Sequence, residues 1–234
     1  MLLKFAATGT FAMMASAQTL EQAKRAFDAQ RYAEAARLFE TARERDHSCE
    51  ISFYLGLTRY RLHESDAALI AFQEAAKCDP NLTLAHIAMG EAYAERGNQS
   101  EAIAAYERAL RLAPENVAAL RGAAALYTQS QLNEKAAAAL ERLVKRQPDD
   151  AQAHADLGAA YFGTGNQEGA EKEFQEALRL NPKFAPALLG AGNLLLRKGD
   201  EAHAMEMLRR VVLLSPRAYE PHFLLGSAYN RLGQ

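Results

Sequence analysis

The six histidines are the residues of this 234-residue chain best suited to metal or acid–base chemistry. Three of them, His86, His154 and His222, follow one another at intervals of 68 residues. Neither that wide spacing nor a carboxylate partner favours a metal site, whose ligands must meet around one ion. We therefore expect these side chains to pack between helices with their ring nitrogens hydrogen-bonded, and we predict no metal site.

Other residue patterns that resemble catalytic motifs lack the residues or elements that those motifs require. His63-Glu64 lacks the second histidine of a zinc-protease helix. Gly163, Gly165 and Gly169 are spaced like part of a phosphate-binding loop, but no strand is expected before them. The sequence has no G-x-S-x-G motif, no P-loop and no Cys–His pair. It therefore predicts a chain that is not an enzyme and holds no cofactor.

Pairs of short amphipathic helices would position these residues, and residues 83–116 show the pattern best. Apolar residues recur there every three or four positions, as on the buried stripe of a helix. They are Ala85, Met89, Ala92 and Tyr93, then Ala102, Tyr106, Ala109 and Leu110. Gly97 and Asn98 separate the two runs, since glycine ends helices in the left-handed conformation and asparagine caps the next helix. Glu101 predicts a capping box with Asn98, and Pro114 closes the unit.

The same unit recurs at a step of 34 residues. A closing proline, an alanine, a small residue and a large apolar residue carry the repeat. They are Pro80, Pro114, Pro148, Pro182 and Pro216; Ala68, Ala102, Ala136, Ala170 and Ala204; Gly56, Gly90, Ala124, Gly158, Gly192 and Gly226; and Phe72, Tyr106, Leu140, Phe174 and Leu208. A helix–turn–helix repeat of this length resembles the tetratricopeptide repeat (TPR) family over nearly the whole chain. The family's tryptophan position departs from the pattern, because it holds serine, histidine or leucine here.

The resemblance implies an all-α fold, a right-handed TPR solenoid of antiparallel helix pairs. We expect an atypical N-terminal unit at 18–48 and an unpaired first helix, or terminal helix, at 219–234. The full units between them are 49–82, 83–116, 117–150, 151–184 and 185–218. Unit 117–150 is rich in alanine, buries less area and should be the softest. The last helix has an apolar face, so either the natural chain continues past Gln234 or this end docks another molecule, a second copy included.

Residues 1–17 resemble a secretory signal peptide. Lys4 precedes an uncharged run, and Ala15-Ser16-Ala17 forms a small-x-small cleavage site. The alternative is an ordinary N-terminal helix or a misplaced start. Export would make the protein periplasmic or secreted, and the alternative location is the cytoplasm.

The two cysteines, Cys49 and Cys78, open the first helix and close the second helix of unit 49–82. Because paired TPR helices are antiparallel, those two ends should lie side by side. A disulfide there would close a loop of about 30 residues and agree with export, since disulfides persist in oxidising compartments. Two separate buried thiols are the alternative.

In the TPR family the first helices line a concave groove that holds a peptide or a partner helix. Carried over position by position, the resemblance places eleven residues in that groove. They are Phe53, Leu57, Tyr60, Arg61, Ile87, Glu91, Arg121, Phe162, Leu189, Asn193 and Arg197. Phe53, Tyr60, Phe162 and Arg197 are the strongest candidates, because aromatic and arginine side chains dominate binding hot spots. The alternative for the leucine and isoleucine members is packing between repeats.

The composition narrows the function further. The formal net charge is −2 with both signs mixed along the chain, which disfavours nucleic acid as a partner. No apolar stretch is long enough to cross a membrane. The sequence predicts a non-catalytic scaffold that binds a protein or peptide partner, in the cell envelope or periplasm. The alternative is the recruiting arm of a larger enzyme or assembly complex that continues past residue 234.

Overall fold

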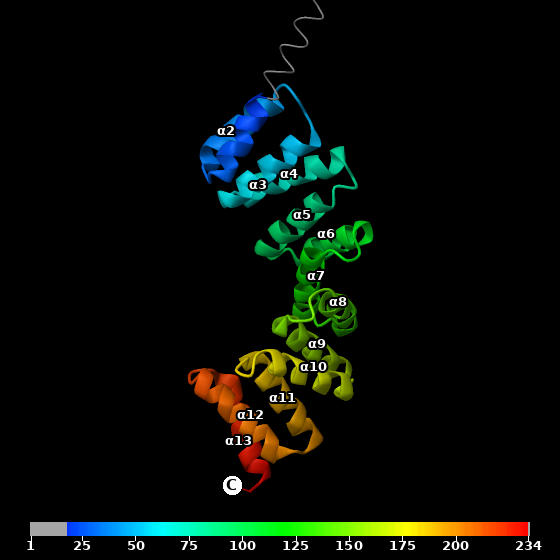
Figure 1. Ribbon diagram of the computed structural model, residues 1–234, viewed down its shortest axis with the longest axis vertical. Helices are drawn as coiled ribbons and strands as arrows, with labels where there is room; N and C mark the ends of the chain where they lie inside the picture. The colour runs from blue at the N-terminus through cyan, green and yellow to red at the C-terminus, as the bar shows by residue number, and fades with distance from the viewer. Residues whose placement is uncertain (1–17, 234) are drawn as a thin grey trace, which may run out of the picture. The chain divides into compact units, whose positions relative to one another are not determined.

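The computed structural model describes residues 18–233, which fold almost entirely into α-helices joined by short turns (Figure 1). Residues 18–28 form the first described helix. The helices that follow are α2 (Tyr32–Arg43), α3 (Cys49–Arg61), α4 (Ser65–Cys78), α5 (Thr83–Glu95), α6 (Gln99–Leu112), α7 (Val117–Gln129), α8 (Asn133–Arg146), α9 (Ala151–Thr164), α10 (Gln167–Leu180), α11 (Ala185–Lys198), α12 (Glu201–Leu214) and α13 (Tyr219–Arg231). No strand occurs within residues 18–233, so the predicted all-α class is confirmed. The expected signal peptide, 1–17, lies outside the described residues.

The chain divides into two compact units, one ending at Ala119 and the other beginning at Leu120. Within each unit, neighbouring helices pack as hairpins, for example α3 on α4 and α9 on α10. The first helices α3, α5, α7, α9, α11 and α13 begin at residues 49, 83, 117, 151, 185 and 219. These are the positions at which the sequence repeat restarts.

The turns inside the hairpins share one backbone conformation. The first or second residue after the first helix of each hairpin has a positive φ, close to the left-handed helical region. Its occupants are Gln30, His63, Gly97, Gln131, Gly165 and Gly199, with φ of 58°, 59°, 75°, 57°, 84° and 78°. The next residue then donates its backbone N–H to the carbonyl five residues earlier, as Asn98 does to Tyr93 at 2.9 Å. This is the Schellman arrangement, which satisfies the last carbonyls of the helix.

The predicted capping box of α6 is wrong. Asn98 occupies the N-cap position, but its side chain accepts no capping hydrogen bond. Its backbone N–H is already bonded to Tyr93, so Glu101 has no donor to accept from there and instead accepts from Ser100 Oγ at 2.7 Å. The equivalent Asn166 does cap α10, through Gly169 N at 3.0 Å.

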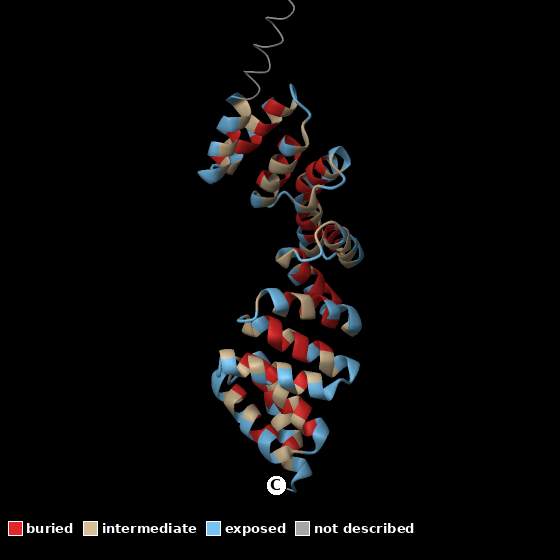
Figure 2. Cartoon of the chain, turned by 45° about the vertical axis from the view of Figure 1, so that its right-hand side comes forward, coloured by how far each residue is buried: buried red, intermediate tan, exposed pale blue. Residues whose placement is uncertain are grey.

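A small residue on the first helix of a repeat faces a large residue on the second. A Cβ on Gly90 would lie 2.9 Å from the ring of Tyr106, and one on Gly158 would lie 2.8 Å from Phe174. Such contacts are too close for any side chain, so glycine lets the large ring fill the interior of the hairpin. In repeat 117–150 the corresponding pair is Ala124 and Leu140, both buried. Buried residues elsewhere also gather on the faces where helices meet (Figure 2).

A disulfide joins Cys49, the first residue of α3, to Cys78, the last residue of α4. The two Cα atoms are 5.3 Å apart, so the opposite ends of the hairpin lie side by side. The bond closes the hairpin at the end away from its turn.

Candidate functional site

The three repeated histidines hold consecutive repeats together. His86 Nε2 lies 3.1 Å from the carbonyl oxygen of Pro80, and His154 and His222 make the same contact at 3.0 Å with their own closing prolines. Each imidazole therefore ties a first helix to the turn that precedes it. This confirms the expectation that their rings are hydrogen-bonded, but His222 is exposed and so does not pack between helices as expected. Within residues 18–233, no three His, Cys, Asp or Glu side chains come together as a metal site.

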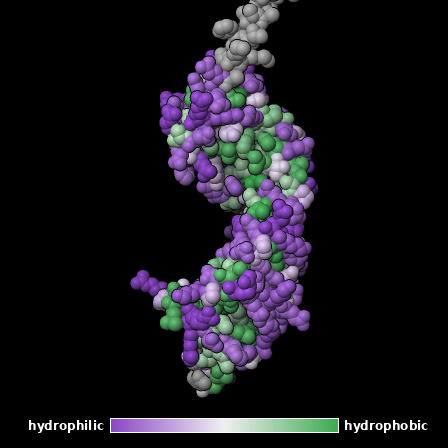
Figure 3. All heavy atoms as spheres, viewed as in Figure 1, coloured by the Kyte–Doolittle hydropathy of each residue, from purple (hydrophilic) through white to green (hydrophobic). Residues whose placement is uncertain are grey.

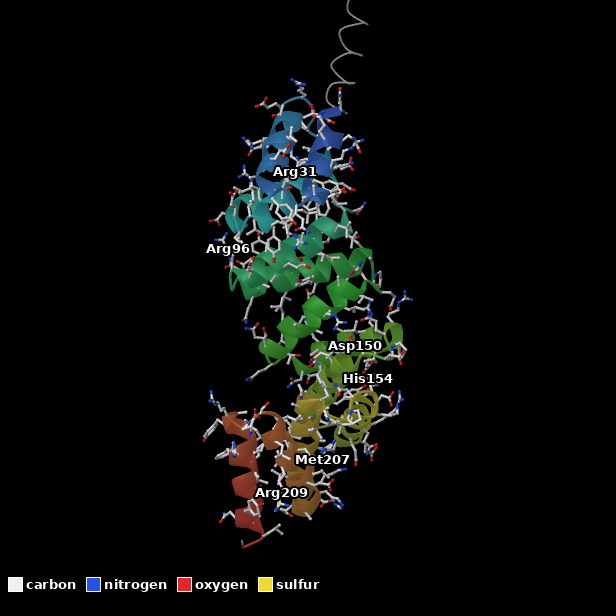
Figure 4. The ribbon with its side chains drawn as sticks, turned by 60° about the vertical axis from the view of Figure 1, so that its left-hand side comes forward. Arg31, Arg96, Asp150, His154, Met207 and Arg209 are labelled. Carbon is white, nitrogen blue, oxygen red and sulfur yellow. A yellow bond between two sulfur atoms is a disulfide. The ribbon has the colours of Figure 1, made fainter. Side chains whose placement is uncertain are left out.

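His154 is the most enclosed of the three. It lies one turn after Asp150 at the start of α9 (Figure 4). Its Nδ1 is also 2.6 Å from Glu173 Oε2 on α10. The ring therefore bridges the turn at Pro148 and helix α10.

The groove candidates of the first unit divide into a half-buried base and an exposed rim. Phe53, Leu57 and Tyr60 on α3 are half-buried and pack against a cluster that includes Phe72. On the face drawn in Figure 3, apolar side chains gather at the surface of this unit among polar ones. The exposed rim holds Arg61 on α3 and Glu91 on α5. The partly exposed apolar side chains of α3 therefore lie among the charged groups of Arg61 and Glu91.

The prediction for Ile87 is wrong. Its exposed fraction is 6%, so this side chain belongs to the core and offers no surface to a partner. It lies at the same repeat position as Phe53, and the shorter isoleucine sinks between helices where the longer phenylalanine reaches the surface.

Three side chains of the first unit, on α3, α5 and α6, have shifted pKa values. Burial raises the pKa of Tyr60, and the nearby Glu95 and Glu91 add to the rise. Burial also raises the pKa of Tyr106, again with Glu91 nearby. Loss of hydration raises the pKa of Glu91 although its side chain is exposed, and Arg61 opposes that rise. Both phenols therefore stay protonated at neutral pH, which equips them to donate hydrogen bonds rather than to act as bases.

In the second unit the structure brings two of the strongest candidates together. The guanidinium carbon of Arg197 on α11 lies 4.6 Å from the ring centroid of Phe162 on α9, a cation–π contact. Phe162 is half-buried against the cluster that contains Phe174. Leu189 and Asn193 are half-buried on α11, and Arg197 is exposed. The pair places a charged side chain beside an aromatic ring on neighbouring first helices.

The second unit also has a hollow of about 300 Å³. Its walls come from α7, α8 and α9. They are Arg121, Ala124, Ala125, Thr128, Leu140, Leu143, Gln152 and Asp156. Among the eleven predicted groove residues, Arg121 lines this hollow, and Asp156 was missed. The sequence signal for Asp156 was its charge at a repeat position that elsewhere holds Tyr54, Ala88, Gly122, Gly190 and Leu224.

The polar groups of the hollow are fixed by hydrogen bonds. Gln152 Nε2 donates to Asp156 Oδ1 at 2.7 Å. Arg121 Nη2 donates to Gln147 Oε1 and Asp150 Oδ2, both at 2.7 Å. Burial raises the pKa of Asp156, with a smaller contribution from Asp150. Burial alone would also raise the pKa of Asp150, but the hydrogen bonds from Arg121 and the backbone of α9 outweigh it and lower the pKa.

Family models cover most of the chain. Residues 20–82 and 83–116 match models described as tetratricopeptide repeat, and residues 124–234 match the cilia and flagella-associated protein 70 middle TPR-like domain. The chain belongs to the tetratricopeptide repeat family. No curated protein matches its sequence.

Solved structures agree with this fold. YrrB, described as a TPR protein with an unusual peptide-binding site, is 22% identical with a TM-score of 0.75, over 83% of this chain and 99% of YrrB. MamA from Desulfovibrio magneticus RS-1, from residue 41 to its end, is 26% identical with a TM-score of 0.66, over 72% and 95% of the two chains. A TPR protein from Parabacteroides merdae is 19% identical with a TM-score of 0.68, over 94% and 87%.

Proposed function

We propose that this chain is a non-catalytic scaffold that holds a protein or peptide partner along the first helices of its repeats. The Phe162–Arg197 pair carries the proposal, because an aromatic ring and a guanidinium on neighbouring first helices form the kind of surface found at binding hot spots. The similarity to YrrB, which has a peptide-binding site, supports it. The half-buried aromatic residues of α3 offer a second surface of the same kind in the first unit.

We further propose that the protein acts in the cell envelope, periplasmic or secreted. Two features support this: the signal-like start at 1–17 and the disulfide between Cys49 and Cys78. No helix of residues 18–233 has both the length and the apolar character needed to cross a membrane. Protein isolated from its own cells should begin at Gln18 and contain oxidised cysteines. A retained Met1 with free thiols would point to the cytoplasm instead.

A recruiting arm of a larger enzyme or assembly complex is the alternative form of the same function. The exposed apolar residues of α13, Tyr219 and Phe223, favour it, because they offer a surface for a further element or partner. The intact mass of the native protein distinguishes the two. A mass larger than that of the printed sequence would support the recruiting arm.

The scaffold proposal is tested by affinity capture from the native envelope fraction, with mass spectrometry of the retained proteins. A Phe53→Ala, Phe162→Ala double variant removes both aromatic surfaces and should lose the partner that the wild type retains. Because both rings also pack on core clusters, an Arg61→Ala, Arg197→Ala variant repeats the test with exposed side chains.

The matched control is an Ile70→Ala, Leu213→Ala variant. These side chains are 58% and 80% exposed and lie on second helices, away from the proposed surface. The control should retain the partner. Capture of the same proteins by the wild type and both groove variants would overturn the groove assignment and leave the apolar face of α13 as the next surface to test.

A further inference from the structure

The hollow of the second unit arises because repeats 117–150 and 151–184 place side chains of different size at equivalent positions. In repeat 151–184 the ring of Phe174 fills the space beside Gly190 of the next first helix so closely that a Cβ on Gly190 would overlap it. In repeat 117–150 the equivalent residues are Leu140 and Asp156, and both line the hollow. A leucine is shorter than an aromatic ring, so space is left. Its volume, about 300 Å³, is at the lower end of the range for ligand pockets.

The charged side chains around this space carry an excess of negative charge. Arg121 already donates to Asp150 and Gln147, so its charge is neutralised at the rim. Gln152 donates to one oxygen of Asp156, Oδ1, which leaves Oδ2 for an incoming donor. Arg121, Asp150 and Asp156 together carry one net negative charge. Asp156 also shares the hollow with the apolar side chains of Leu140 and Leu143, beside which a carboxylate is poorly hydrated.

We propose that this hollow binds one cationic side chain, lysine or arginine, of the partner. The aliphatic stem would lie against Ala124, Ala125 and Leu140, and the charged end would donate to Asp156. Long basic side chains combine such a stem with such an end. An apolar side chain would bury Asp156 with no partner beyond Gln152, and an acidic one would meet it as a like charge. This inference rests on the proposed function, because it names the chemistry of a partner that the scaffold would hold.

The first experiment uses small probes that need no partner. Isotope-labelled protein is titrated with N-acetyl-lysine N-methylamide, and NMR shifts of Ala125, Thr128 and Gln152 report on occupancy. N-acetyl-norleucine N-methylamide has a similar stem without the charge, and N-acetyl-glutamate N-methylamide has the opposite charge. We expect saturable shifts with the lysine probe and binding about tenfold weaker with the norleucine probe.

Three variants locate the effect. Asp156→Asn keeps the shape of the side chain and should weaken binding of the lysine probe about tenfold. Ala125→Leu should block binding of the probe, because a leucine at this exposed position would fill the hollow. Asp149→Asn, outside the hollow, removes one negative charge nearby and should leave binding unchanged. Equal binding of the lysine and norleucine probes, preference for the glutamate probe, or no saturable shift would each overturn the proposal.

A random nonapeptide library then separates this inference from the proposed function. Enrichment of lysine- or arginine-containing peptides by the wild type and by Asp149→Asn, but not by Asp156→Asn, supports both. Peptides that bind with no basic preference uphold the scaffold and overturn the hollow as a cation site. No enriched peptide together with a saturable lysine probe upholds the cation site and counts against peptide binding.

Discussion

Asp156 combines two properties that oppose one another. Its carboxylate is held by Gln152 inside a partly apolar hollow, where burial raises its pKa. Arg121 on α7 and Asp150 before α9 are the charged groups that act on it, the first lowering and the second raising the pKa. A raised pKa in the folded state means that ionisation of this group disfavours folding. The charge that would attract a cation therefore reduces stability.

The first prediction concerns the pH dependence of that effect. Because the pKa of Asp156 is higher in the folded chain than in the unfolded one, protonation of this group stabilises the fold. This stabilisation is fully present below the ordinary Asp pKa and is lost as the pH rises through the higher pKa of the folded state. Asp156→Asn should therefore be at least as stable as wild type at neutral pH, and the difference should shrink on acidification. Urea unfolding at a series of pH values measures it. A variant that is clearly less stable at neutral pH would show that the carboxylate stabilises the fold.

A second residue-scale prediction concerns Gln131. It has φ of 57° at a turn position where Gly97, Gly165 and Gly199 also have positive φ. A side chain in the left-handed region costs about 1–2 kcal/mol, partly offset by the greater freedom of unfolded glycine. Gln131→Gly should thus raise the free energy of unfolding by about 0.5–1 kcal/mol. His63→Gly, at φ of 59°, is the matched substitution, and a loss of stability in both would contradict the argument.

The element-scale prediction follows from the fit between paired helices. In the hairpin of α7 and α8, Ala124 and Leu140 occupy the two positions at which three other hairpins pair glycine with a ring. Leu140→Phe alone should destabilise by about 1–3 kcal/mol, because the ring would meet the Ala124 methyl group. Ala124→Gly in the same chain should recover much of that loss. Denaturant unfolding of the single and double variants gives the coupling energy, and simple additivity would show that the two positions do not touch.

The same comparison shows what the sequence could and could not predict. The 34-residue step located the helix pairs, the turn at Gly97 and the hydrogen-bonded histidines, because each depends on a residue type at a repeated position. Ile87 was misplaced, since a position shared with Phe53 does not fix how deep a shorter side chain lies. The hollow was missed because it depends on the relative sizes of Leu140 and Asp156, which belong to different repeats.

At the scale of the whole molecule, stability should be local. Because repeats contact mainly their neighbours, a perturbation in one hairpin should lower the stability of that hairpin before it affects distant ones. The disulfide lies in the hairpin of α3 and α4 and joins two positions that are 29 apart in the sequence. On the loop-entropy model its reduction should lower stability by about 3–4 kcal/mol.

Hydrogen exchange with and without reductant tests this fourth prediction. Amides of α3 and α4 should lose protection after reduction, while those of α9 to α12 should keep it. A Cys49→Ser, Cys78→Ser variant without reductant is the control and should resemble the reduced wild type. Loss of protection spread evenly over residues 18–233 would indicate that the chain opens as one cooperative block.

The size match across repeat borders also bears on how such a gene can change its length. Phe72 packs in one cluster with Ala88, Phe174 packs on Gly190, and Leu140 shares the hollow with Asp156. Loss of residues 117–150 by unequal crossover would join Tyr106 to a helix carrying Asp156, and would set a ring against a carboxylate in the space left by a leucine. Recombination between such repeats is therefore constrained by the fit between the large residue of each second helix and the residue that it contacts on the next first helix. The hollow is kept only when repeats 117–150 and 151–184 are inherited together.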